Sequence, residues 1–160
     1  MKRINLIYNN VIYREKFDKL QVVEKNRVFC NHTLGHNMDV ARLMYIKSLE
    51  DGIGLDKEII YATALMHDIG RLEQYEKNVP HEEAGAKLCD IILPDCEFVE
   101  DEISEIKEAV KYHRKDADKN KSKLAELLRW ADKNSRCCFE CAAISECNWS
   151  FDKLNMEIEY

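Results

Sequence analysis

The stretch 62–71, ATALMHDIGR, most constrains how this chain can fold, because an apolar run ends abruptly in His67-Asp68-Ile69-Gly70-Arg71. A helix that is apolar nearly all round is usually buried and central, and Asp56 is a suitable N-cap for one at about 57–68. Burying an adjacent His and Asp without partners is costly. A metal ion would supply a partner for both, so the sequence predicts a buried helix that ends at a metal site.

Few helix breakers interrupt the rest of the chain, which contains only 5 Gly and 2 Pro. This scarcity favours an all-α fold. The chain has 160 residues, of which 46% are hydrophobic and 34% charged, as in an ordinary globular domain. We therefore expect one compact multi-helix domain over 1–160, with its motifs at about 30–135 and a cysteine-rich segment at 137–160.

Charge and composition exclude several classes of protein. The net charge of −6 argues against general nucleic-acid binding, although a metal could still attract a small anionic substrate. No apolar run approaches the roughly 20 residues that span a membrane, and residues 1–10 lack signal-peptide features. Seven cysteines, an odd number, favour free thiols or metal ligation over disulfides. We expect a cytoplasmic protein.

Apolar periodicity predicts the order of the helices. Tyr13, Phe17 and Leu20 share a face of the first helix, and Pro80 and Pro94 bound the fourth. The polar segment 71–79 is expected to be a loop, and the tail beyond 150 a short docking segment. The helices are expected at about 10–28, 33–50, 57–68, 80–94, 100–114 and 120–135.

Six potential metal ligands lie at the starts, ends or inward faces of five of these helices. His36 precedes Val40 by four residues, and Asp132 follows Leu128 by four, so both lie on apolar faces. Each has a simpler explanation, a core histidine for His36 and an inter-helix salt bridge for Asp132. His32 is expected to be structural or exposed. Imidazole and carboxylate suit Fe, Mn, Ni, Co, Zn or Mg. The candidates are His36, His67, Asp68, His81, His113 and Asp132.

Cysteines form a second cluster near the C-terminus. Cys138-x-x-Cys141 and Cys147 have a spacing compatible with a structural zinc, which would need a fourth ligand from Cys137, Cys30 or the tail. An iron–sulfur cluster is a second interpretation. The third is that these cysteines are small hydrophobic residues packed near Trp149.

Three short motifs in order resemble the HD-domain metal-dependent phosphohydrolase superfamily, and in particular its small bacterial members. They are a His followed by Val-Ala at His36, the doublet His67-Asp68 with Ile-Gly and a basic residue after it, and Ala-Asp-Lys at Asp132. Their order and spacing agree with the family over about 30–135. The resemblance implies an α-helical fold that hydrolyses phosphate esters, often in nucleotides.

The resemblance also implies roles for individual residues. His36, His67, Asp68 and Asp132 would hold a first ion, and His81 and His113 a second one that Asp68 bridges. Where two-metal members often have a doubled His, this chain has Tyr112-His113. A metal-activated water would attack phosphorus in line while a cation neutralises the phosphate. Arg71 is the first candidate cation, with Arg114 and Lys115 as others, and a salt bridge to Glu73 or Glu76 is the alternative role for Arg71.

Two other functions use the same residues. Some proteins with this helical scaffold are di-iron oxygenases, and a non-catalytic sensor of a nucleotide or metal is a third interpretation. Oxygen-dependent turnover would distinguish the oxygenase, and ligand binding without turnover the sensor. Specificity for a small phosphorylated substrate, such as a nucleotide, would come from 72–80, 111–118 and the tail.

Overall fold

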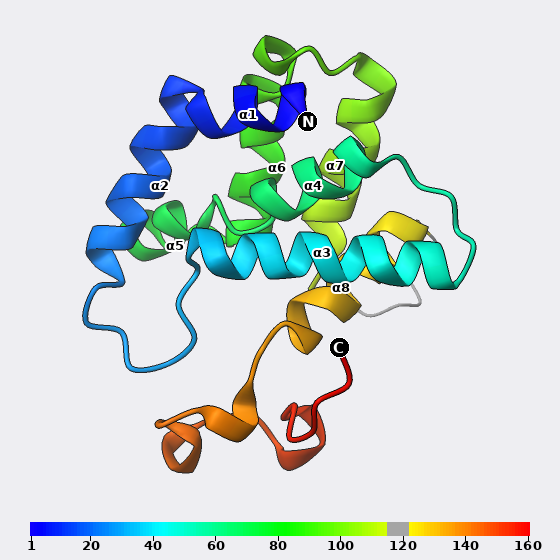
Figure 1. Cartoon of the computed structure of the whole chain (residues 1–160). Helices are drawn as coiled ribbons and strands as arrows, with labels where there is room; N and C mark the ends of the chain where they lie inside the picture. Colours follow the sequence, from blue (N-terminus) through cyan, green and yellow to red (C-terminus); the bar gives the residue numbers. More distant parts are fainter. Residues whose placement is uncertain (115–121) are drawn as a thin grey trace.

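The structure, a computed structural model, describes residues 1–114 and 122–160 and is all-helical there, with no strands, as the composition predicts. The helices pack as a bundle, and the C-terminal segment lies beneath it (Figure 1). The helices are α1 (Lys2–Asn9), α2 (Val11–Val23), α3 (Leu34–Glu50), α4 (Lys57–Met66), α5 (Arg71–Lys77), α6 (His81–Ile92), α7 (Glu100–Tyr112) and α8 (Lys123–Asn134).

Helix α4 is the central element, which confirms the prediction from its apolar sequence. Every residue from Ile59 to Met66 is buried, and α4 packs against α1, α3, α6, α7 and α8. The Asp56 side chain caps its start by accepting hydrogen bonds from the backbone N–H groups of Glu58 and Ile59. The helix ends at Met66, earlier than predicted, so the His67-Asp68 doublet lies in the turn that follows.

The N-terminal prediction of one helix at 10–28 agrees with the start of α2, but α2 ends five residues early, at Val23, and the additional helix α1 at Lys2–Asn9 was not predicted. The side chain of Asn10 accepts hydrogen bonds from the N–H groups of Ile12 and Tyr13, which starts α2 separately from α1. Helix α2 ends at Val23, and the next residue, Glu24, turns its carboxylate toward His32. The segment between α2 and α3 therefore reaches the site described below.

The segment 71–79, predicted to be a loop, contains helix α5 instead. Leu72 is buried and anchors this helix, while Lys16 of α2 pairs with Glu73. Asn78 ends the helix in the left-handed conformation, with φ of 55°. The helix was not predicted because the segment is mostly polar. Its packing depends on the single buried residue Leu72 and on the ion pair between Glu73 and Lys16 of α2.

The remaining helices lie close to their predicted positions. Helices α3 and α6 start and end within two residues of prediction, and α7 ends two residues early. Helix α8 is described from Lys123, so the predicted start at 120 lies outside the described residues, as do Lys115 and part of the predicted specificity region 111–118.

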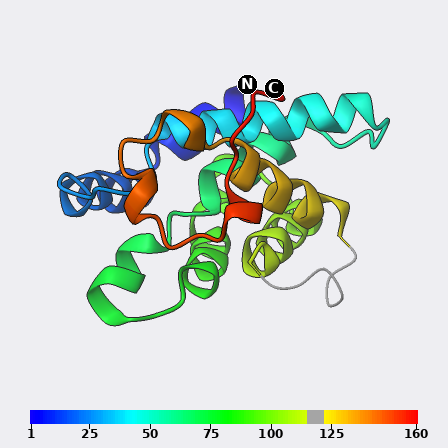
Figure 2. The same ribbon diagram turned by 90° about the horizontal axis from the view of Figure 1, so that it is seen from below.

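The C-terminal segment 135–160 consists of short 3-10 turns that fold back onto the bundle, as Figure 2 shows from below. Its docking contacts are polar and aromatic. The side-chain amide of Asn155 donates to the carbonyls of Asn134 and Arg136, and the ring of Tyr160 packs edge-on against Trp130. Two apolar residues of this tail, Phe151 and Ile158, are 77% and 80% exposed.

Candidate metal centre

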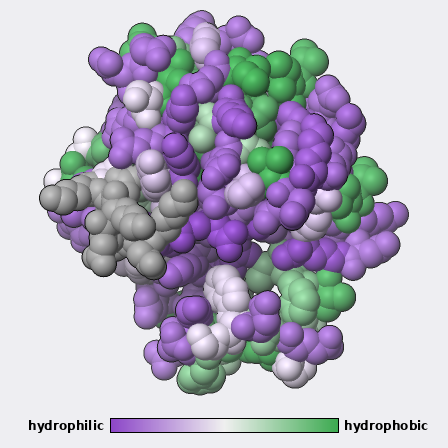
Figure 3. Space-filling model, turned by 180° about the vertical axis from the view of Figure 1, so that it is seen from behind, coloured by the Kyte–Doolittle hydropathy of each residue, from purple (hydrophilic) through white to green (hydrophobic). Residues whose placement is uncertain are grey.

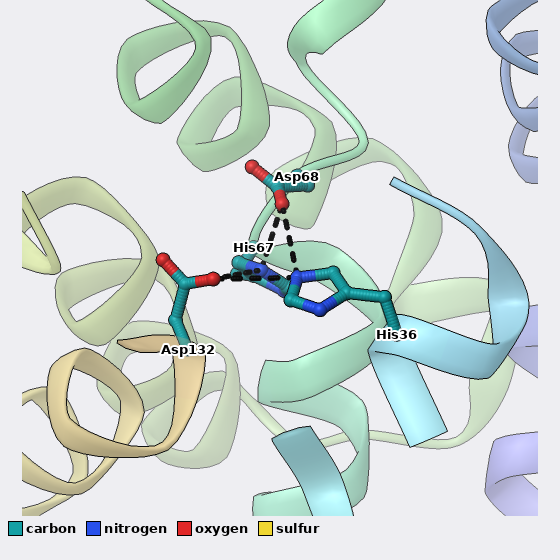
Figure 4. Close-up of side chains that lie close together, drawn as sticks. All are labelled: His36, His67, Asp68 and Asp132. Carbon is teal, nitrogen blue, oxygen red and sulfur yellow. Dashed lines mark ion pairs between the residues drawn. The ribbon is translucent and has the colours of Figure 1, made fainter. Parts of the chain in front are cut away.

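The six predicted ligands converge from five helices or their ends. They form two groups, and within each group the ligand atoms lie within 4.8 Å of one another. Asp68 belongs to both groups. Figure 4 shows the first group, with the side chains pointing toward one another. The first group is His36, His67, Asp68 and Asp132, and the second is Asp68, His81 and His113.

The first group joins α3, the end of α4 and α8. His36 Nε2 lies 3.3 Å from Asp132 Oδ1 and 3.7 Å from Asp68 Oδ2. His67 Nε2 lies 2.9 Å from Asp68 Oδ2 and 3.9 Å from Asp132 Oδ1. Two imidazole nitrogens and two carboxylate oxygens therefore surround one point, as ligands of a first-row metal do.

The second group lies on the other side of Asp68. His81 Nε2 is 3.4 Å from Asp68 Oδ1 and 3.3 Å from His113 Nε2. Because the closest contacts to His36 and His67 use Oδ2, the two oxygens of Asp68 face the two groups separately. A carboxylate in this position can bridge two ions.

Hydrogen bonds on the outer side of three histidines fix their tautomers. Nδ1 of His67 lies 2.7 Å from the carbonyl of Ala64, and Nδ1 of His113 lies 2.6 Å from that of Val110. Nδ1 of His81 lies 3.0 Å from the side-chain oxygen of Gln74. Since these oxygens accept, each Nδ1 carries the proton and each Nε2 keeps a lone pair toward the site. Histidine ligands of metals are commonly oriented this way.

The chemistry of the donor set fits a divalent cation. His67 Nε2 and Asp68 Oδ2 are buried without a hydrogen-bond partner, a costly state for both atoms. The lone pairs of His81 and His113 face each other at 3.3 Å, which is unfavourable unless a cation or proton lies between them. A metal ion in each group would satisfy all four atoms.

Burial and mutual charge set the ionisation of these residues. Burial would raise the pKa of Asp68, but the positive charges that His67 and His32 carry when protonated outweigh it and hold that pKa well below its usual range. Burial and the nearby charge of Arg71 lower the pKa of His81 to about 2, and burial also lowers the pKa of His113. The second group therefore presents neutral imidazoles and an ionised carboxylate near pH 7, the forms that bind metals.

Two arginines contact the ligand carboxylates. Arg71 donates from Nε to Asp68 Oδ1 at 2.9 Å, rather than pairing with Glu73 or Glu76. Arg136 donates from Nη2 to Asp132 Oδ1, also at 2.9 Å, and that nitrogen lies 3.4 Å from His36 Nε2. Arg136 was not predicted from the sequence, although its position four residues after Asp132 was a readable helical spacing.

A cavity of about 390 Å³ opens beside the first group. Arg71 and Arg114, two of the three predicted phosphate-binding residues, line it, whereas Lys115 lies outside the described residues. Much of the remaining wall comes from the C-terminal segment. The lining residues are Arg27, Phe29, Cys30, His32, Arg71, Arg114, Asp132, Arg136, Cys138, Cys141, Ile144, Cys147, Asn148, Trp149 and Leu154.

The cysteine cluster is not among the groups whose ligand atoms lie within 4.8 Å of one another in the described residues. Cys138, Cys141 and Cys147 all line the cavity. They lie in or next to the 3-10 turns at 138–140 and 144–146. All seven cysteines are free thiols, and Cys138 is buried like a small hydrophobic residue.

His32, expected to be structural or exposed, is buried and also lines the cavity. Its Nε2 lies 3.8 Å from Asp68 Oδ2, and its Nδ1 lies 2.6 Å from Glu24. Glu24 also accepts hydrogen bonds from the backbone N–H of His32 and the hydroxyl of Tyr75. The pair was not readable from the sequence, because its members lie eight positions apart on irregular chain.

Substituting Glu24→Gln is expected to lower the free energy of unfolding by about 1–3 kcal/mol, the cost of a buried polar group without its partner. The glutamine oxygen can still accept from Nδ1 of His32, but its NH₂ group would face the backbone N–H of His32. Urea denaturation of both proteins measures the difference. Asp18→Asn, at an exposed pair on α2, is the matched control.

The difference in unfolding free energy between wild type and Glu24→Gln should depend on pH in a defined way. Burial would raise the pKa of Glu24, but hydrogen bonds from His32 outweigh it and lower the pKa from 4.5 to about 2. A lowered pKa means that the stabilisation is complete above 4.5 and is lost as the pH falls toward 2. The stability gap between wild type and variant should therefore shrink as the pH falls from 4.5 toward 2. A gap that widens over this range would contradict the assignment.

The all-helical fold and the two His/Asp groups agree with the family that the sequence motifs resemble. The HD domain model matches residues 33–137, and the chain belongs to the HD-domain family. A protein of Clostridium beijerinckii, described as uncharacterized, is 42% identical over 160 residues, and the alignment covers 100% of each chain.

A solved structure shows the same fold. It is that of a predicted HD superfamily hydrolase from an uncultured Thermotogales bacterium, with a TM-score of 0.64 and 22% sequence identity over 89% of this chain and 81% of that one. Among the described residues of the present chain, no helix is both long and apolar enough to cross a bilayer.

Proposed function

We propose that this protein hydrolyses a phosphoester or phosphoanhydride bond in a nucleotide or another small phosphorylated molecule. The observation that carries the proposal is the position of Asp68, whose two oxygens face separate histidine groups beside a cavity lined by arginines. Free thiols at all seven cysteines support a reducing compartment, the cytoplasm, as the place of the reaction.

The donor set supports two divalent ions per chain, of Fe, Mn, Ni, Co, Zn or Mg. Asp68 would be shared, with His36, His67 and Asp132 on the first ion and His81 and His113 on the second. Bound there, the ions would supply positive charge at the phosphate and a water of lowered pKa.

The chain itself orients the phosphate. Arg71 is held by Asp68 through Nε and by Gln74 through Nη1, so its guanidinium is fixed at the wall of the cavity. A fixed guanidinium binds phosphate oxygens bidentately and neutralises charge as the bond to the leaving group breaks. Arg114 lies on the same wall and is the second candidate for this role.

Turnover of a panel of phosphate esters tests the proposal. The purified protein, loaded in turn with Mn, Co, Ni and Fe under anaerobic conditions, should release phosphate from at least one nucleoside or sugar phosphate. Turnover that requires both iron and oxygen would contradict it in favour of the oxygenase. Ligand-induced stabilisation without any turnover would contradict it in favour of the sensor.

A further inference from the structure

The outer part of the cavity is aromatic rather than purely cationic. Trp149, from the C-terminal segment, and Phe29, from the segment before α3, both line it. Their side chains are 37% and 40% exposed, so each leaves ring surface open to a ligand. Figure 3 shows the C-terminal segment as a separate lobe, with mostly hydrophilic side chains where it meets the helical body.

Arg136 connects this aromatic part to the metal ligands. One end of its guanidinium donates to Asp132 Oδ1 at 2.9 Å, and the guanidinium carbon lies 6.0 Å from the ring centroid of Trp149. The same guanidinium therefore lies near both the first ligand group and the tryptophan. A ligand whose phosphate lies at the first group would place its next few atoms beside Trp149.

The arginines that line the cavity indicate that such a ligand carries an anionic group. Arg27, Arg71, Arg114 and Arg136 all line the cavity of a chain whose net charge is −6. Within the part of the chain that the structure describes, the hydrogen bonds of Arg27 go to the hydroxyl of Tyr75 and the carbonyl of Cys30, which are neutral oxygens. Clustered positive charge in a cavity of an acidic protein concentrates anions there.

We propose that the C-terminal segment forms a subsite for a planar aromatic ring, carried by the group to which the phosphate is attached, and that Trp149 is its stacking surface. The inference rests on the proposed function, because it concerns the part of the same ligand that lies beyond the phosphate. A nucleoside phosphate has this chemistry, with an anionic end for the arginines and a π-face for the tryptophan. A ring-free sugar or alkyl phosphate lacks the second part.

Binding of two phosphonates, which have no hydrolysable ester bond, tests the subsite by calorimetry on the metal-loaded protein. One is the methylenephosphonate analogue of adenosine monophosphate, and the other is a short alkylphosphonate without a ring. Trp149→Ala and Trp149→Leu should weaken the nucleoside phosphonate about tenfold, the scale of base–aromatic stacking, and change the alkylphosphonate less than about twofold. Trp149→Phe should restore most of the loss.

Phe151→Ala is the matched control, because Phe151 lies in the same segment but does not line the cavity and is 77% exposed. It should bind both phosphonates like wild type. Equal weakening of both by the Trp149 variants, or no weakening of either, would overturn the subsite. If the wild type hydrolyses phosphate esters but the Trp149 variants do not selectively weaken the nucleoside phosphonate, the subsite alone would be overturned. If the Trp149 variants selectively weaken the nucleoside phosphonate but no ester is hydrolysed, the proposed function alone would be overturned. If the protein binds neither phosphonate, both the subsite and the proposed function would be overturned.

Discussion

Substituting Asp68→Ala is expected to remove the bound metal and to lower hydrolytic activity by roughly 10³-fold or more, as loss of a principal charge-stabilising group does. Asp68 contributes an oxygen to both ligand groups, so its loss disrupts both. Helical content should persist, because the apolar core around α4 does not depend on this carboxylate. His67→Ala should have the same direction of effect, with the second group left intact.

Metal content, far-UV circular dichroism and turnover, measured on one preparation, check this expectation. Asp90→Ala is the matched control, since Asp90 is a half-exposed carboxylate on α6 that pairs with Lys107. It should keep both metal and activity. Full activity in metal-free Asp68→Ala protein would show that the reaction does not use this centre.

Substituting Gly70→Ala is expected to lower the free energy of unfolding by about 3 kcal/mol, at the upper end of overpacking costs. A Cβ atom at Gly70 would lie 2.2 Å from the carbonyl oxygen of His81 and 2.6 Å from the backbone nitrogen of Gly85. Both atoms belong to the backbone of α6 and cannot move without shifting that helix. His81 would move with it, so occupancy of the second ligand group should fall as well.

Urea denaturation and metal content together test this effect. Gly35→Ala is the matched control, because a Cβ there meets only the Thr33 hydroxyl at 3.4 Å, an ordinary contact, in the first turn of α3. It should be neutral or stabilise by about 0.4–1 kcal/mol. A Gly70→Ala protein within about 0.5 kcal/mol of wild type, the range of harmless surface changes, would contradict the close packing of the two segments.

The sequence predicted the central helix and the inward faces of its neighbours, because both follow from apolar periodicity. Burial of Val40 and Met44 beside His36, for example, is a consequence of helical spacing alone. Helix α1 was not predicted, although α2 begins close to its predicted start, where the side chain of Asn10 caps it. Helix α5 was missed because its burial comes from contacts to α2 and α6 rather than from its own pattern.

The candidate site likewise contains residues that were predicted from the sequence and residues that were not. Six ligands were predicted from motifs and helix positions, and the structure brings all six together. The pairing of His32 with Glu24 was missed because irregular chain joins the two residues, whereas Arg136 was missed although its four-residue spacing from Asp132 could be read. The cysteine spacing suggested a metal, but spacing along an irregular segment does not determine where side chains meet.

The central claim is that Asp68 is shared by two ligand groups, each of which holds one ion. Elemental analysis of protein reconstituted with Mn under anaerobic conditions tests it most directly, alongside the double variant His81→Ala and His113→Ala. We predict two ions per chain in the wild type and one in the double variant. A wild type that holds at most one ion, with the same count in the double variant, would contradict the claim.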